Sequence, residues 1–591
     1  MGELRSAERS WRMIVLSLLL DALGGDTPTG ELAPAADAWQ LVVAADRAAS
    51  AAADDVLMRP PVGIWAAHML RRIQRSATGP VPLWVEAGYL HALAAAAAIR
   101  AGLSFELTVP ARHGVAVLPT LGHSVLPVTT PWSTVRVTCR DGVFEVRTTD
   151  GASVGPGTPA WRDPVIVTAT ADGQELTVEL MDCDPYRDLR GPTPPHPLPP
   201  AEIEHWQRLL TAAWSLLVRE QPDRAPAIAA TVRAFTPVEP RERFRHLSAS
   251  GGEAFGNVLL SDLDDPVDLA VTLVHEAQHQ KLGALLHLLT LSDEDPGHRY
   301  YAPWRDDPRP LGGLLQGVYA FAAITEFWGG HRSPEHAALA AFELALWRGQ
   351  TAATIRTLLA GEQLTSWGRR FVEHLREPVA ACLRRPVPEH VDRLARLAAL
   401  DHQAMWRGHH LVVEPATVAA LAQAWRHGAP APAVPADSRV TTSASPEVGR
   451  FDTRAVLIRY LLTDPDRLRR LRDDPELLAT AVTGAQPADA DLIRGDRAAA
   501  AVAYAGLVTA DPASVHGWVG LGLALSDQPD SAAARALLSR PELVRAVACR
   551  LATTAGPDEA RPDPVRLAAW LGADLPAASP EMPVPAVWPV A

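Results

Sequence analysis

The residue pattern with the clearest chemistry in this chain is a glutamate flanked by two histidines, His275, Glu276 and His279. In a helix, residues four apart share one face with Cβ atoms about 5–6 Å apart, so both imidazoles can reach one metal ion. Glu276 then projects about 100° around the helix, which suits proton transfer or a supporting hydrogen bond beside the metal. Two structural histidines beside a glutamate are the alternative. We expect a metal site, with His275 and His279 as ligands and Glu276 as the catalytic residue.

An HExxH helix is typical of zinc peptidases, in which the glutamate is the general base and a third ligand follows downstream. The extended metzincin spacing needs glycine at 282 and histidine at 285, where this chain has Leu282 and Leu285. His287 would lie about 12 Å along the helix from His279, too far to share an ion. A gluzincin needs a glutamate from a later helix, and Glu326 is available. A metzincin is therefore excluded, and a zinc metallopeptidase of the gluzincin type stays open.

A proline-rich segment at 299–310 follows the motif. Three prolines within eight residues forbid a helix, so we expect a fixed loop before the next helix. Arginine suits bidentate binding of a carboxylate, which makes Arg305 and Arg309 candidates for holding a ligand. The alternative is that both arginines pair with Asp306 and Asp307 and stiffen the loop.

The segment from Gly256 to about Trp328 resembles a bacterial HExxH-motif family, the 2-oxoglutarate-dependent HExxH-type peptide β-hydroxylases associated with modified-peptide biosynthesis of the FxSxx type. The resemblance covers about 70 of 591 residues. The Tyr-Ala-Pro-Trp-Arg sequence after HExxH is more specific than HExxH alone. The matching residues are Leu260-Ser261, the HExxH residues, Lys281-Leu282, the run from Tyr301 to Pro310 and the run from Leu314 to Phe321.

This resemblance implies an Fe(II) centre bound by His275 and His279, with 2-oxoglutarate as cosubstrate. Oxidative decarboxylation to succinate and CO2 would drive hydroxylation of a peptide β-carbon. Arg305, or failing that Arg309, would bind the distal carboxylate of 2-oxoglutarate. In that chemistry Glu276 could orient water or a histidine, because hydroxylation needs no general base.

The third metal ligand has two candidates. Iron oxygenases of this kind typically use two histidines and one carboxylate, and Glu326 supplies a carboxylate. Gln316 stands where many members of the family carry histidine, a departure that leaves the third ligand open.

The resemblance also implies partners: a ribosomally made precursor peptide as substrate, and a radical SAM maturase from the same pathway. No radical SAM cysteine triplet (CxxxCxxC) occurs in this chain. A third alternative is a non-catalytic scaffold that binds a peptide.

Composition narrows the function classes further. The chain has 55 basic and 68 acidic residues, a net charge of −13, which argues against a nucleic-acid partner. The apolar N-terminal stretch at 13–20 is far shorter than the roughly 20 residues that span a bilayer, so we expect no membrane association. Four widely spaced cysteines without a CxxC pair fit a reducing compartment, and we expect a cytoplasmic protein.

Periodicity predicts a mainly α fold with a small antiparallel β unit (α+β), in several units, with the metal site between two core helices. The helix with the motif is expected at 266–292 and the next at 311–328. Asp141-Gly142 and Asp172-Gly173 predict hairpin turns. The expected domains are an N-terminal helical region at 1–110, the β unit at 111–190, a helical HExxH catalytic domain at 201–428 and, after a Pro/Ala/Ser-rich break at 429–446, a C-terminal helical domain at 447–591 with a tetratricopeptide-like (TPR-like) hairpin.

Overall fold

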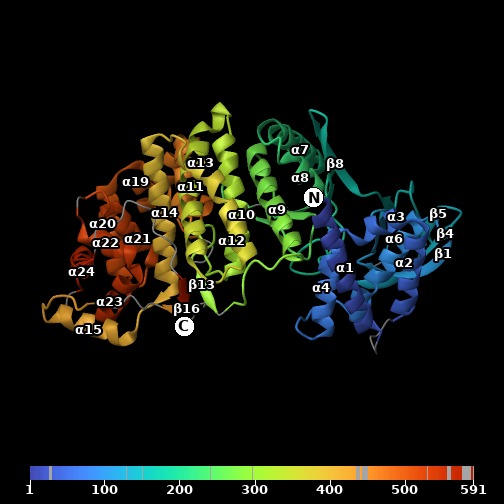
Figure 1. The fold of residues 1–591 in the computed structure, drawn as a ribbon, viewed down its shortest axis with the longest axis horizontal. Coiled ribbons are helices and arrows are strands. Elements are labelled where there is room, and N and C mark those ends of the chain that lie inside the picture. Colours follow the sequence, from blue (N-terminus) through green and yellow to red (C-terminus); the bar gives the residue numbers. More distant parts are fainter. Residues whose placement is uncertain are drawn as a thin grey trace. The chain divides into compact units, whose positions relative to one another are not determined.

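The chain forms two compact units. Unit 1 contains residues 1–241 and 246–289, and unit 2 contains residues 242–245 and 290–591. Helices hold 57% of the chain and strands 13%, which confirms the predicted mainly α fold with a β unit (Figure 1). The computed structural model describes residues 1–24, 30–127, 130–148, 151–239, 241–295, 297–433, 439–441, 450–528, 530–554 and 561–575, and the backbone of 587–589.

The predicted domain at 201–428 contributes residues to both units. Most of the break predicted at 429–446 lies outside the described residues. No helix in the described part of the chain is both long and apolar enough to cross a membrane.

The N-terminal part of unit 1 is helical, as its Ala- and Leu-rich sequence predicts. At its centre lies α6, in which every residue from Tyr89 to Ala98 is buried. Small alanine side chains let α2 and β1 pack closely against it. The helices are α1 (Gly2–Leu23), α2 (Ala35–Ala48), α3 (Ser50–Leu57), α4 (Pro60–Ile73), α5 (Leu83–Ala87) and α6 (Tyr89–Arg100).

The predicted antiparallel β unit is a seven-stranded sheet in the order β6-β5-β4-β1-β2-β3-β7. Asp141 and Gly142 join β4 to β5 with φ angles of 53° and 79°, the left-handed backbone of a tight hairpin turn. The strands are β1 (Phe105–Arg112), β2 (Val115–Leu118), β3 (Gly122–Val125), β4 (Trp132–Arg140), β5 (Val143–Arg147), β6 (Ser153–Val154) and β7 (Trp161–Arg162).

A second sheet, of five strands, supports the HExxH helix. Its order is β11-β12-β10-β9-β8, and β10 runs parallel to both β9 and β12. Helix α7 packs on β8 and on α9, the HExxH helix, and α8 packs on α9 and β9. The elements are β8 (Val165–Ala171), β9 (Gln174–Leu180), α7 (Pro200–Glu220), α8 (Ala225–Thr231), β10 (Ala234–Val238), β11 (Ser248–Ala249), β12 (Asn257–Ser261) and α9 (Pro266–Leu286).

The place of β8 and β9 differs from the prediction. Both fall in the range 111–190 and form the predicted hairpin, with Asp172 at φ 44° and Gly173 at φ 76°. However, β9 pairs with β10, so the hairpin belongs to the five-stranded sheet and not to the seven-stranded one. Alternating apolar and polar residues predict the two strands, and Asp172-Gly173 predicts the turn between them. The sheet that the hairpin joins depends on contacts with segments distant in the sequence.

Unit 2 is almost entirely helical. Its first part contains β13 (His298–Tyr300), α10 (Leu311–Gly330), a 3₁₀ turn (Pro334–His336), α11 (Ala337–Ala360), α12 (Ser366–His374), α13 (Arg376–Leu383), α14 (Glu389–His410), β14 (Leu411–Val412), α15 (Pro415–Arg426) and β15 (Arg439–Val440). Its second part contains α16 (Thr453–Thr463), α17 (Pro465–Asp473), α18 (Pro475–Ala481), α19 (Pro487–Arg494), α20 (Arg497–Ala510), α21 (Val515–Leu525), α22 (Ala532–Ser539), α23 (Pro541–Thr553), α24 (Pro564–Leu571) and β16 (Val587–Pro589).

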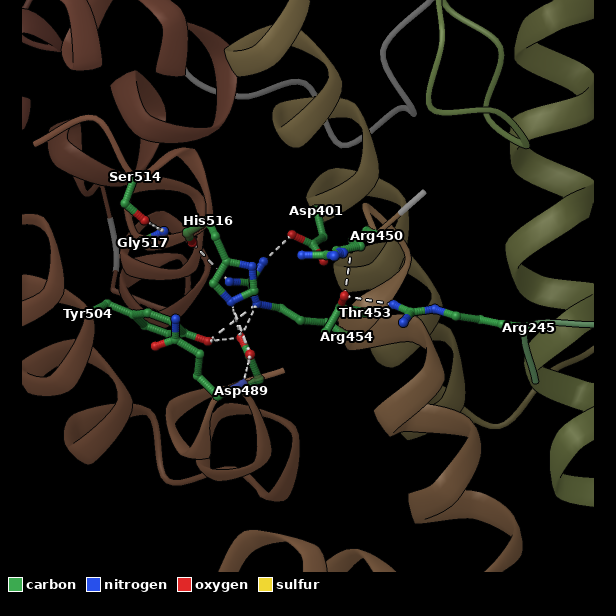
Figure 2. Close-up of polar contacts among 11 residues, drawn as sticks. Arg245, Asp401, Arg450, Thr453, Arg454, Asp489, Tyr504, Ser514, His516 and Gly517 are labelled. Carbon is green, nitrogen blue, oxygen red and sulfur yellow. Dashed lines mark hydrogen bonds and ion pairs between the residues drawn. The ribbon is translucent and has the colours of Figure 1, made fainter. Parts of the chain in front are cut away.

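A buried arginine joins several of these helices (Figure 2). Arg454 of α16 is 1% exposed and pairs with Asp401 of α14 at 2.5 Å and with Asp489 of α19 at 2.8 Å. Asp489 also accepts hydrogen bonds from the Tyr504 hydroxyl at 2.5 Å and from the His516 Nε2 atom at 2.9 Å. We call these five residues the Arg454 network.

The helical hairpin predicted near the C-terminus is present as α20 packed on α21. Gly495 ends α19 with a left-handed φ of 96°. At Gly520, an added Cβ would lie 2.4 Å from the ring of Tyr504, so only glycine allows this approach. These contacts explain Gly495 and Gly520, two residues that match the TPR pattern, while the likeness of the hairpin to a TPR unit stays a prediction.

Candidate metal centre

The HExxH residues lie on α9, whose start is set by local sequence. The Asp265 side chain accepts a hydrogen bond from the Val267 backbone N–H at 2.8 Å, and Pro266 occupies the first turn. The helix ends at Leu286, earlier than the predicted 292. Beyond it, His287 bonds to Glu8 of α1 at 3.1 Å, so this histidine serves to anchor the end of the helix.

The two motif histidines converge. Their Nε2 atoms are 2.9 Å apart, and their rings are 4.5 Å apart at an angle of 78°. Two nitrogens bound at a right angle to one ion, with bonds of about 2.0–2.1 Å, would be about 2.9 Å apart. Burial lowers the pKa of His275 to about 4, more than the Glu276 carboxylate raises it. His275 is therefore neutral at pH 7, the form that binds a metal.

The central glutamate is held in place from one side. Glu276 is 1% exposed, and its Oε1 atom accepts a hydrogen bond from the Ser248 hydroxyl of β11 at 2.6 Å. Its Oε2 atom is buried with no hydrogen-bond partner among the described residues. The carboxylate is thus fixed in direction and retains one unused acceptor.

A further glutamine fixes the rotation of α9 about its own axis. Gln280 is buried, accepts a hydrogen bond from the Gly256 N–H at 2.8 Å and donates one to the Asn257 carbonyl at 3.0 Å. It lies four residues after Glu276, so both side chains point from one face of α9 toward the five-stranded sheet. The histidines, one position earlier in each case, are thereby directed to the adjoining face.

The two residues that hold α9 in place, Gln280 and Ser248, differ in whether the sequence could have pointed to them. Gln280 directly follows the motif, and a polar residue with helical spacing from Glu276 could have been noticed. Ser248 is distant from the motif in sequence, and no spacing rule singles it out.

The lone lysine, Lys281, lies next to this region on α9. Burial, aided by the nearby Arg224, lowers the pKa of Lys281 to about 8. A partly buried ammonium with this pKa carries its charge for only part of the time near pH 8.

The remaining predicted site residues belong to unit 2. Residues 301–310 form a loop, as predicted, whereas Arg299 and Tyr300 belong to the short strand β13. The backbones of Tyr300 and Arg309 close the loop with two hydrogen bonds of 2.8 and 3.0 Å. Arg305 and Arg309 both bind the Asp307 carboxylate, each at 2.9 Å. The loop therefore already holds a carboxylate between its two arginines.

Other loop residues point inward and anchor it. Tyr301 bonds to the His402 Nδ1 atom at 2.9 Å, and Asp306 lies 3.3 Å from the Nε2 atom of the same ring. Trp304 stacks on Phe321 with ring centroids 4.7 Å apart. Much of the Tyr-Ala-Pro-Trp-Arg sequence is thus explained by packing within unit 2.

Both candidates for the third ligand lie on α10. Gln316 and Glu326 are partly buried. Ten residues of helix separate them by about 15 Å, so they cannot both bind the same ion. The two predicted histidine ligands, His275 and His279, lie on α9 of unit 1.

Comparison of the chain with protein-family models and with curated proteins gives no match.

Proposed function

We propose that this chain is an Fe(II)- and 2-oxoglutarate-dependent dioxygenase that hydroxylates a β-carbon in a ribosomally made precursor peptide. The observation that supports the proposal best is the convergence of the His275 and His279 Nε2 atoms, 2.9 Å apart on a buried helix. A radical SAM maturase is the proposed partner in the same pathway. The four cysteines are free, which agrees with a cytoplasmic location.

The residues of α9 fit a metal ion by their chemistry. His275 and His279 would supply two imidazole ligands, and the bound iron would supply the activation of dioxygen. The tie from Glu276 to Ser248 and the tie from Gln280 to β12 hold the imidazoles in position. Their directions therefore do not need to be ordered at the moment of binding.

Glu326 and Gln316 are the proposed third ligands, one excluding the other. A carboxylate completes the two-histidine, one-carboxylate set, which favours Glu326. The test is metal affinity: Glu326→Ala and Gln316→Ala should differ, with only the ligand variant losing more than about 100-fold, above the 10–100-fold cost of losing a supporting partner.

Arg305 and Arg309 are the proposed binding residues for the distal carboxylate of 2-oxoglutarate. Their joint hold on Asp307 is the supporting observation, because it presents a carboxylate to two guanidinium groups. A cosubstrate would share or replace Asp307. Arg309 has a further feature in its favour, a buried Nε–H without a hydrogen-bond partner in the described part of the chain.

A zinc metallopeptidase of the gluzincin type is the second candidate, with Glu276 as the general base. The buried, unpartnered Oε2 atom of Glu276 favours it, because such an acceptor can take a proton from water. In that case Glu276→Gln should lower kcat about 10²–10⁴-fold. Hydroxylation should lose less than about tenfold, because Glu276 transfers no proton in it.

The deciding experiment uses the full chain loaded anaerobically with Fe(II) and 2-oxoglutarate, together with a ribosomally made precursor peptide. After oxygen is admitted, we expect succinate and a peptide heavier by one oxygen atom. His275→Ala should abolish both, while the exposed histidine variant His374→Ala should leave both unchanged. Peptide cleavage without succinate would establish the peptidase instead.

A further inference from the structure

Unit 1 contains a second group of metal-ligand side chains, in a part of the sequence that shows no motif. His123 lies on β3, and Asp182 and Cys183 follow β9. One ligand atom from each residue lies within 4.8 Å of those of the other two. In the described part of the chain, no other three or more His, Cys, Asp or Glu side chains gather so closely.

The backbone explains how these residues meet. Gly122 has a φ of 122°, and a Cβ there would lie 2.2 Å from the Arg162 carbonyl, so glycine lets β7 approach and directs His123. Consecutive side chains of a strand point to opposite faces. Because β9 ends at Leu180 and the chain bends at residues 182–183, the two neighbours can turn toward one point.

One ring nitrogen of the histidine in this cluster is not hydrogen-bonded in the described part of the chain. His123 is 6% exposed, and its Nε2 atom is buried with no hydrogen-bond partner among the described residues. Buried polar atoms in native proteins nearly always have a partner, so an orphan beside a thiol and a carboxylate indicates a missing ligand. Cys183 is 3% exposed, and Asp182 is held at its Oδ2 atom by the Leu198 N–H at 3.3 Å.

A small, partly open pocket lies beside the cluster and is lined by all three residues together with Arg59 and Glu179. Arg59 and Glu179 form two hydrogen bonds of 2.6 and 2.7 Å with each other. Their charges are thus paired within the pocket wall. The groups that remain for an ion are the imidazole, the thiol and the Asp182 carboxylate, and the ion would replace the hydrogen bond between the Cys183 thiol and Asp182.

We propose that His123, Asp182 and Cys183 bind a Zn(II) ion in unit 1, with the fourth coordination position facing this pocket. Imidazole nitrogen, thiolate sulfur and carboxylate oxygen are the three ligand types that zinc accepts. A thiolate disfavours Mg(II) and Ca(II), which prefer oxygen ligands. Binding forms a Zn–S bond and releases the thiol proton of Cys183 to solvent.

The fit requires a small adjustment. Neighbouring ligand atoms around a tetrahedral zinc are about 3.5 Å apart, given bonds of about 2.0–2.3 Å. The present spread of up to 4.8 Å closes by rotation of Asp182, the least buried of the three. The bound ion would link β3 of the seven-stranded sheet to the end of β9 in the five-stranded sheet, within unit 1.

The test separates this site from the HExxH pair. The full chain carrying His275→Ala and His279→Ala is titrated with Zn(II) against a chromophoric chelator, and with Co(II) followed by absorbance. We expect one equivalent of Zn(II) and a near-ultraviolet sulfur-to-cobalt charge-transfer band. Adding Cys183→Ala should remove the band and weaken Zn(II) binding more than about 100-fold, above the cost of losing a supporting partner.

Two further variants keep the test decisive. Cys139→Ala, at a buried cysteine of β4, should leave both the band and the affinity unchanged. Asp182→Asn, at a partly exposed position that tolerates an isosteric change, should weaken Zn(II) binding while the band persists. Absence of the band before Cys183 is changed, or its survival in Cys183→Ala, overturns the proposal. Because the background lacks both HExxH histidines, either result is independent of the proposed dioxygenase activity.

Discussion

Glu276 on α9 of unit 1 and Asp489 in the Arg454 network of unit 2 are both buried carboxylates, 1% and 0% exposed. Asp489 has partners at both oxygens: Tyr504 and His516 at Oδ1, and His516 together with the Gln486 N–H at Oδ2. Glu276 has one hydrogen-bond partner, Ser248 at Oε1, and the His275 Nε2 atom lies 3.9 Å from the same oxygen. Its Oε2 atom has no hydrogen-bond partner in the described part of the chain. A fully satisfied network holds helices together, whereas a partly satisfied one is kept for another purpose.

The groups around Asp489 also differ in charge from those around Glu276. Burial alone would raise the pKa of Asp489, but His516 and Arg454 together hold it below its usual range. Asp489 is thus an ionised partner of cations, whereas Glu276 is bonded to a neutral hydroxyl. Removing the negative charge should therefore destabilise the surroundings of Asp489 much more than those of Glu276.

The largest effect should come from Arg454→Met. It leaves Asp401 and Asp489 buried without their cation, so the free energy of unfolding of unit 2 should fall by about 3–5 kcal/mol. Urea denaturation followed by circular dichroism measures this. Arg393→Ala removes only an exposed pair with Glu389 and is the control. Equal losses for the two variants would contradict a structural role for the network.

Exchanging carboxylate for amide compares the two sites directly. Asp489→Asn removes a charge that pairs with Arg454 and should destabilise unit 2 by about 3 kcal/mol. Glu276→Gln keeps the acceptor for Ser248 and removes a half-satisfied charge, so the stability of unit 1 should change by less than about 1 kcal/mol. Thermal and urea unfolding of both variants would test this, and a larger loss for Glu276→Gln would reverse the comparison.

Two glycines of unit 2 test how tightly the helices pack around the Arg454 network. In Gly520→Ala the new methyl would meet Tyr504 and the Arg454 guanidinium, lowering the stability of unit 2 by about 1–3 kcal/mol. Gly506→Ala of α20 meets nothing within 4 Å and should stabilise the helix by about 0.5–1 kcal/mol. The sign of the difference in urea midpoint is the test, and two changes of the same sign would contradict it.

The smallest effect should be confined to acid. A carboxylate whose pKa is depressed on folding contributes stability above its unfolded pKa, about 3.9, and loses that contribution as pH falls through the lower folded value. The stability of unit 2 should therefore decline below about pH 4. Asp489→Asn should flatten this decline, and an unchanged slope in urea midpoint between pH 4 and 2 would contradict it.

Features encoded by neighbouring residues could be predicted from sequence. The spacing of His275 and His279 determined their convergence once the segment was helical, and Asp141-Gly142 and Asp172-Gly173 formed the expected turns. The prolines of 299–310 produced a loop. Each of these outcomes depends on local geometry, which a single sequence records.

Features formed by distant residues could not be predicted. Ser248 reaches Glu276 only because β11 pairs with β12, and His123 meets Cys183 only because two sheets come together. The sequence allows two interpretations of Arg305 and Arg309, ligand binding or pairing with neighbouring aspartates. The structure contains the pairing of both arginines with Asp307. Which residues meet when they are far apart in the sequence depends on tertiary contacts, and a single sequence does not reveal those contacts.

The double hydrogen bond of Gln280 has a consequence for the orientation of the candidate metal ligands His275 and His279. A twist of α9 that swung the imidazoles away would have to break both bonds to Gly256 and Asn257 together with the Ser248 tie. Rotating α9 so that the two histidines point elsewhere therefore costs several hydrogen bonds at once. The face of α9 that carries the histidines stays in one orientation. Any regulation of the proposed activity at this helix would therefore act on the access of ligands to that face.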